Sequence, residues 1–226
     1  MASWNALMIK GLVDAAKIFN ENSFLDTAIK ANKFICENLI NEGILYHSYK
    51  NGKLGVNGFL EDYAFLADAL LSLFEVTADK KYLDKAIELI NYSIQHFYDD
   101  KSGMFFYTAD NAEQLIARKM EVTDNVTPAS NSVMANVLYR LYRLTDNTFY
   151  YEKTIKMLKA MQEFIQGYGS AYSNWMMLQQ QILSFKKELV IYGNNSKQFY
   201  HQVHQHYLPD TLVVYSEKES DLPLFK

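Results

Sequence analysis

Three carboxylates stand close to the starts of helical segments in this chain. Glu61 and Asp62 form an adjacent pair, and Asp124 precedes a later helix. A positioned carboxyl group can act as a general acid or base. Glycosidic bond cleavage typically uses two carboxyl groups about 5–10 Å apart, one on either side of the bond. The residue types therefore suggest sugar chemistry, and Asp62 with Asp124 is the pair that we expect to act together.

Side chains suited to ligand binding accompany these acids. Trp4 and Tyr63 have rings that can stack on a sugar. The side chains suited to hydrogen bonding are Asn5, Asn125, Ser130 and Asn131. All lie near helix N-termini, where free N–H groups and the helix dipole favour polar and anionic ligands. We therefore expect these six residues to bind the substrate.

An internal repeat predicts that these residues meet. The segment 24–29 (Phe-Leu-Asp-Thr-Ala-Ile) aligns with 82–87, an offset of 58 residues, and Tyr82 aligns with Tyr150, an offset of 68. The same offsets superpose 4–5 on 62–63 and on 130–131. A fixed period of this size is typical of stacked or ring-forming units. The three pairs are thus expected at the same end of neighbouring helices.

Ordinary helix capping is the competing interpretation of each of these residues. Asp and Glu in a first turn are favoured by the helix dipole, and Ser or Asn there commonly caps free N–H groups. Taken singly, each residue is explained equally well by capping. Their coincidence across three aligned repeats favours a pocket, since pockets form where repeat loops converge.

Apolar residues at helical spacing predict helical hairpins. The expected helices cover 3–20, 24–40, 61–76, 81–97, 131–144, 149–165 and 171–185. Ser3 and Ser23 are the expected N-caps of the first two. Short β segments at 44–49 and 104–108 follow the first and second hairpins, and Asn51-Gly52 signals a hairpin turn.

The pattern changes after residue 187. Strands at 188–193 and 211–215 flank a helix at 196–207, which predicts a small βαβ-like unit with parallel strands. We therefore expect a partial (α/α) toroid of three helical hairpins plus one helix over 1–186. A small α/β appendage and tail would cover 187–226. The fold class is mainly α, with about half of a six-hairpin ring, because a closed ring of this kind needs six hairpins.

Composition excludes several classes of protein. A net charge of −4 argues against nucleic acid as a partner. No apolar run approaches the roughly 20 residues that span a bilayer, and no signal peptide precedes the first helix, so we expect a cytoplasmic protein without a membrane partner. Cys36 is the single cysteine and is expected to be buried.

Neither a metal nor another cofactor is expected from the sequence. His201, His204 and His206 lie close together, but no Cys or acidic ligand accompanies them, so a solvated helix face is the better interpretation. The strand before Asn194-Asn195 has a single glycine and no dinucleotide-binding motif.

Three motifs carry a resemblance to a known family. They are 3–9 (Ser-Trp-Asn-Ala-Leu-Met-Ile), 58–65 (Gly-Phe-Leu-Glu-Asp-Tyr-Ala-Phe) and 128–132 (Pro-Ala-Ser-Asn-Ser). In this order, and over nearly the whole chain, the sequence resembles the thioredoxin-domain-containing family that includes YyaL and spermatogenesis-associated protein 20.

The resemblance implies a longer parent protein. Family members carry an N-terminal thioredoxin-like domain, followed by a six-hairpin toroid similar to glycosidases and N-acylglucosamine 2-epimerases. This chain resembles the C-terminal half of that toroid, and Met1 directly before the first motif fits a piece of a longer protein. Because no Cys-x-x-Cys motif is present, the redox chemistry of the family does not carry over.

Two hypotheses on function and one on this chain alone follow. In the first, the parent is a sugar hydrolase or epimerase that uses Glu61, Asp62 and Asp124 for acid and base chemistry. In the second, the toroid is a non-catalytic module that binds a ligand or protein beside the thioredoxin-like domain. We expect this chain alone to be inactive, and we expect its exposed toroid flanks to form a homo-oligomer.

Overall fold

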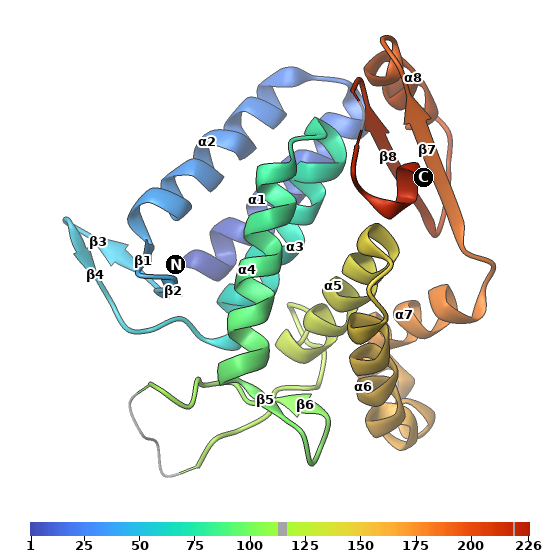
Figure 1. Cartoon of the computed structure of the whole chain (residues 1–226). Helices are drawn as coiled ribbons and strands as arrows, with labels where there is room; N and C mark the ends of the chain where they lie inside the picture. Colours follow the sequence, from blue (N-terminus) through green and yellow to red (C-terminus); the bar gives the residue numbers. More distant parts are fainter. Residues whose placement is uncertain (113–116, 219) are drawn as a thin grey trace.

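Three helical hairpins and a further helix build most of the protein (Figure 1). The computed structural model describes residues 1–112, 117–218 and 220–226. The hairpins are α1 (Ala2–Phe19) with α2 (Asn22–Asn38), α3 (Leu60–Thr77) with α4 (Lys80–His96), and α5 (Ser130–Thr145) with α6 (Thr148–Gly167); a 3₁₀ turn (Gly169–Tyr172) then leads into α7 (Ser173–Leu183). The mainly α-helical fold class is confirmed, and the helix ends differ from the predicted ones by a few residues.

The helices form an inner and an outer layer. Helices α1, α3 and α5 pack side by side, and each also packs against its hairpin partner α2, α4 or α6. Helix α3 is buried almost all round, from Leu60 to Val76, whereas α4 is buried along one stripe only. A helix that is buried on every side belongs to the interior of a layered fold. We call α1, α3 and α5 the inner helices.

The three hairpin turns share one geometry, which confirms the repeat. The residue after each inner helix, namely Asn20, Ala78 or Asp146, adopts the left-handed conformation with φ of 52°, 55° or 53°. The predicted caps were wrong for the first hairpin. Ser3 lies inside α1, which is preceded by Met1, and α2 is preceded by Glu21 rather than capped by Ser23.

Short antiparallel hairpins connect the helical units. They are β1 (Ile40–Asn41) with β2 (Ile44–Leu45), β3 (Tyr49–Lys50) with β4 (Lys53–Leu54), and β5 (Tyr98–Asp99) with β6 (Met104–Phe105). The predicted turn at Asn51-Gly52 is confirmed, since both residues have positive φ, 52° and 76°. The predicted strand at 44–49 is instead split between β2 and β3, and the one at 104–108 is limited to β6.

The C-terminal residues form the predicted βαβ unit. Strands β7 (Lys187–Tyr192) and β8 (Thr211–Ser216) pair in parallel around α8 (Ser196–Val203), and a 3₁₀ turn (Pro223–Phe225) follows. Figure 1 shows this unit at the upper right, away from the β5–β6 hairpin at the bottom. The hydroxyl of Tyr215 donates to the carbonyl of Val76 at 3.1 Å, and Arg143 binds Glu188 at 3.2 Å. These contacts fix the unit to α3 and α5.

None of the described helices is long and apolar enough to cross a membrane. The half-buried Cys36 is the single thiol, and burial raises its pKa.

Replacing Tyr215 by Phe tests how the C-terminal unit is held. The substitution removes the buried hydrogen bond to Val76 and is expected to lower the free energy of unfolding by about 1 kcal/mol. Urea denaturation measures the change. The matched control is Tyr192→Phe on β7, where the ring is 61% exposed and the expected change is within about 0.5 kcal/mol. Equal effects of the two substitutions would contradict this role of Tyr215.

Candidate functional site

One face of the inner helices lines a cavity of about 580 Å³. Spacings of three and four residues place the lining side chains on one face of each helix. On α1 they are Leu7, Lys10, Asp14 and Lys17, on α3 Phe65, Asp68, Ser72 and Glu75, and on α5 Val133, Asn136, Arg140 and Arg143. Pro128 before α5, Asn174, Met177 and Gln181 of α7, and 210–212 of the C-terminal unit complete the lining. We call this space the inner cavity.

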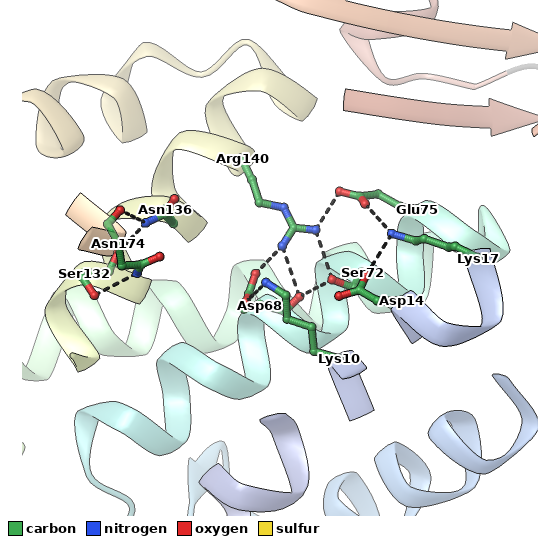
Figure 2. Close-up of polar contacts among 10 residues, drawn as sticks. All are labelled: Lys10, Asp14, Lys17, Asp68, Ser72, Glu75, Ser132, Asn136, Arg140 and Asn174. Atoms are coloured by element: carbon green, nitrogen blue, oxygen red, sulfur yellow. Dashed lines mark hydrogen bonds and ion pairs between the residues drawn. The ribbon is translucent and has the colours of Figure 1, made fainter. Parts of the chain in front are cut away.

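A chain of ion pairs crosses the inner cavity between the helices (Figure 2). Lys10 of α1 binds Asp68 of α3 at 2.5 Å, and Lys17 binds Glu75 at 3.1 Å. Arg140 of α5 binds both Asp68 and Glu75, the latter at 2.7 Å. Asp68 and Glu75 of α3 are therefore shared between the helices on either side of it.

The ion pairs hold Asp68 and Glu75 in the charged form. Burial opposes the ionisation of Glu75, but Arg140 and Lys17 outweigh it and lower its pKa to about 2. Burial likewise opposes the ionisation of Asp68, but the charges of Lys10 and Arg140 outweigh it and lower its pKa. Both groups thus stay ionised at neutral pH.

These five residues were not predicted from the sequence, although a signal for them exists. The offset of 58 that aligns the helix starts also relates Lys10 to Asp68 and Lys17 to Glu75. The offset of 68 relates Ser72 to Arg140. When the alignment is extended from the first turns to the whole helices, these residues form one polar stripe that recurs in all three repeats.

Glu61 lies one turn before Phe65 on the same face of α3 and is half-buried. The hydroxyl of Ser3 donates to its Oε1 at 3.2 Å. Burial and the charge of Asp62 raise the pKa of Glu61, and the bond from Ser3 opposes this shift. A carboxyl group that keeps its proton to higher pH is suited to act as a general acid.

Two further side chains near Glu61 were not found from the sequence. Burial and the charge of Glu61 raise the pKa of Tyr107, whose half-buried ring stacks on Phe59 at 4.9 Å. The exposed Glu121 accepts a hydrogen bond from the Ser130 N–H at 3.0 Å, and its charge adds to the raised pKa of Glu61. Both lie outside the helices of the repeat, so no periodic pattern marks them.

Asp62 holds backbone groups of α1 and α3 in place. Its side chain is fully buried and accepts hydrogen bonds from the backbone N–H groups of Ser3 at 2.8 Å and Phe59 at 2.9 Å. His47 Nδ1 lies 2.9 Å from its Oδ2. Asp62 thereby caps α3, fixes the first turn of α1 and orients His47. The catalytic role predicted for Asp62 stays untested, and its burial leaves Glu61 as the accessible member of the pair.

Asp124 also caps helices. It accepts hydrogen bonds from the Ala129 N–H at 2.9 Å, the Ser132 hydroxyl at 2.7 Å and the Asn174 N–H at 2.9 Å. These bonds join the start of α5 to the start of α7. Asp62 and Asp124 thus hold different helix starts, and the prediction that they act together stays untested.

The structure separates the predicted binding residues into exposed and buried ones. Trp4 is 67% exposed, and Asn5 and Asn125 are also exposed, with the Asn5 amide donating to the Met1 carbonyl. Ser130 and Asn131 are fully buried.

Asn131 and Tyr63 serve the packing of the protein. The Asn131 amide accepts from the Phe105 N–H at 2.8 Å and donates to the Phe105 carbonyl at 2.9 Å, as a neighbouring strand would. The hydroxyl of Tyr63 accepts from the Leu45 N–H at 2.9 Å, and its ring stacks on Tyr92 at 5.1 Å. Tyr63 is 1% exposed, so its ring packs inside the protein, and its predicted role in substrate binding stays untested.

One group of side chains approaches the geometry of a metal site. Ligand atoms of His47, Glu61 and Asp62 lie within 4.8 Å of one another. Both oxygens of Asp62 already accept hydrogen bonds from N–H groups. His47 and Glu61 are then the two residues of this group left to bind an ion, whereas zinc sites use three or four protein ligands. At the other end of the protein, His204 Nδ1 lies 2.9 Å from the Tyr200 carbonyl. We continue to expect no metal.

Comparison with solved structures defines the class of fold. A family 76 alpha-mannanase of Bacteroides thetaiotaomicron aligns with a TM-score of 0.63 and 13% identity, over 100% of this chain and 65% of that chain. A cellobiose 2-epimerase from Bacillus thermoamylovorans aligns with a TM-score of 0.55 and 13% identity, over 70% and 43%. These likenesses show the fold, and the predicted six-hairpin glycosidase-like (α/α) toroid is confirmed.

Comparison with curated sequences confirms the family resemblance. Spermatogenesis-associated protein 20 of Rattus norvegicus is 28% identical over 96% of this chain and 29% of the relative. An uncharacterised protein of Caenorhabditis elegans is 27% identical over 98% of this chain and 32% of the relative. The chain thus spans about a third of the length of the curated relatives it matches. No family model matches the sequence.

Asp62→Asn tests the capping role of that carboxylate. The substitution removes a buried charge from two N–H groups and is expected to lower the free energy of unfolding by about 2 kcal/mol. Chemical denaturation is the measurement, and Asp26→Asn, at an exposed position of α2, is the control. A change of less than about 0.5 kcal/mol in Asp62→Asn would show that the cap does not hold α1 and α3 together.

Glu75→Gln tests the ion pairs of the inner cavity. The ordinary pKa of Glu75 is 4.5 and its folded value is about 2, so its charge stabilises the fold above pH 4.5. That contribution is lost as the pH falls from 4.5 toward 2. The variant is expected to lose about 3 kcal/mol at pH 7 and to show a smaller decrease in stability across this pH range.

Denaturation at several pH values measures both effects. Glu163→Gln, at an exposed position of α6, is the control and is expected to keep the full pH dependence. An unaltered pH dependence in Glu75→Gln would contradict the assignment.

Proposed function

We propose that this chain supplies part of the sugar-binding wall of a carbohydrate-active (α/α) toroid, with Glu61 as the general acid at the mouth of the inner cavity. The observation that carries the proposal is the position of Glu61. It is half-buried with a raised pKa, and it stands on the same helix face as the polar side chains of the cavity. A protonated carboxyl beside a polar cavity is suited to protonate a glycosidic oxygen.

The polar wall supports a saccharide as the ligand. Sugar hydroxyls both donate and accept hydrogen bonds, and the cavity presents ammonium and guanidinium donors, carboxylate acceptors, and amides that do both. Its volume of about 580 Å³ falls in the usual range for small-molecule sites, roughly 300–1,000 Å³.

The proposed chemistry assigns a different second carboxylate from the one expected. Glu61 donates its proton to the leaving oxygen, and Glu121, which is exposed and interacts electrostatically with Glu61, is the candidate base or nucleophile. Asp62 is a positioning residue that holds Glu61 and His47 in place.

One of the similar structures supports a role for adjacent acidic residues. It is an inactive variant of an alpha-1,6-mannanase of Salegentibacter with two consecutive aspartates replaced by asparagine, in complex with alpha-1,6-mannotriose. It aligns with a TM-score of 0.59 and 13% identity, over 71% of this chain and 46% of that chain. Glu61 and Asp62 are adjacent acids in this chain.

A non-catalytic binding module is the second candidate. It is favoured by the engagement of Asp62 and Asp124 in helix caps, since neither is left to act on a substrate. In the longer parent, the module would present its ligand to the thioredoxin-like domain that the family resemblance implies. The homo-oligomer stays a prediction, and exposed apolar side chains such as Met8 on α1 and Leu183 on α7 are those it would cover.

The test combines saccharide binding with the titration of Glu61. Ligand-observed NMR with cellobiose and alpha-1,6-mannobiose is expected to show saturable binding to the chain. The ¹³C carboxyl signal of Glu61 is expected to titrate above its ordinary value of 4.5, and saccharide is expected to raise this pKa further. The reason is that a protonated Glu61 would donate to a sugar oxygen, which stabilises the neutral form.

The carboxyl signal of Glu163, exposed on α6, is the control and is expected not to respond to saccharide. Absence of binding to both disaccharides would contradict the proposed function. Binding that leaves Glu61 unaffected, with no product after long incubation, would favour the non-catalytic module.

A further inference from the structure

We infer that the inner cavity selects neutral, polyhydroxylated sugars over uronic acids and amino sugars. The inference deepens the proposed function, on which it rests, by naming the class of ligand. It depends on how the charges of the wall are paired with one another, and not on Glu61.

The charges on the wall are balanced. Among the described residues that line the cavity, the cations are Lys10, Lys17, Arg140 and Arg143, and the anions are Asp14, Asp68, Glu75 and Asp210. Four charges of each sign leave no net charge on the wall. Neither an anionic nor a cationic ligand is therefore attracted by the wall as a whole.

The cations of the wall already have partners. Lys10 is paired with Asp68, Lys17 with Glu75, and Arg140 with both carboxylates. Arg143 binds Glu188 at 3.2 Å and the Lys187 carbonyl at 2.6 Å. A ligand carboxylate would have to separate one of these pairs or enter without a counter-charge. Both are costly, because a charge taken out of water needs a partner.

A neutral hydroxyl group meets no such obstacle. Within the alternating array of donors and acceptors, it can donate to Asp68 or Asp14 while it accepts from Lys10, whose side chain is 41% exposed.

The opposite side of the cavity adds neutral groups. Figure 2 shows the Asn136 and Asn174 amides side by side near Ser132. The Asn136 amide nitrogen donates to the Ser132 carbonyl at 2.9 Å, and that of Asn174 donates to the Ser132 hydroxyl at 2.9 Å. These bonds orient the amides. Among the residues that the structure describes, neither side-chain oxygen accepts a hydrogen bond, so both can accept one from a ligand hydroxyl.

Matched sugars in which one neutral group is replaced by a carboxylate or an ammonium group test the inference. The probes are glucose and mannose, their uronic acids, and glucosamine and mannosamine, titrated into the chain by ligand-observed NMR at pH 7. At least one neutral sugar is expected to bind at least tenfold more tightly than its charged counterparts.

Two substitutions of opposite sign predict the direction of change. Lys10→Gln makes the wall net negative and is expected to strengthen binding of the amino sugar and weaken that of the uronic acid, each by about fivefold, since one unit charge at close range changes affinity by roughly this factor. Asp14→Asn makes the wall net positive and is expected to do the reverse. The side chains of Lys10 and Asp14 are 41% and 51% exposed, so both variants are expected to fold.

The outcomes separate this inference from the proposed function. Uronic acid or amino sugar binding as tightly as the neutral sugar would overturn the inference alone, as would two variants that shift selectivity in the same direction. Absence of binding to every probe would contradict the proposed function together with the inference.

Discussion

The arrangement of the inner helices depends on two carboxylates of α3 that are shared between their neighbours. Asp68 and Glu75 face Lys10 and Lys17 on one side and Arg140 on the other. A polar helix face cannot be placed inside a protein unless its charges are matched, because an unpaired buried charge is strongly unfavourable. The ion pairs therefore allow three helices to present polar side chains to one cavity, and they require that the helices keep a fixed axial register.

The same register also brings the first turns of α1 and α3 together. Because α1 and α3 are aligned along their length, the first turn of α1 reaches the first turn of α3, where Ser3 donates from its N–H to Asp62 and from its hydroxyl to Glu61. Asp62 thus caps the helix, while Glu61 remains half-buried with a raised pKa. Capping and the proposed acid role are therefore compatible at this site, since the cap positions Glu61.

Much of the fold follows from local sequence patterns. The repeated hydrophobic spacing predicts the hairpins, Asn51-Gly52 predicts a turn, and the apolar segments around α8 predict parallel strands, because each depends on residues close in sequence. The site is harder to predict. Whether Asp62 or Tyr63 is accessible depends on the packing of α1 and of the segment around Leu45 against α3, which no local pattern contains. The contribution of Glu121 depends on a loop that returns to α3, and the sequence gives no sign of that return.

The proposed function requires that a saccharide contact the wall of the inner cavity around Arg140 and Asn136 of α5 and Asn174 of α7. The most direct measurement is ¹⁵N NMR of the side-chain guanidinium and amide groups while cellobiose is added to labelled protein. We expect these side-chain signals to move together with those of Glu61, and signals from the outer helices α2, α4 and α6 to stay in place. Changes confined to the outer helices, or side-chain signals of the cavity that remain constant while cellobiose binds, would contradict it.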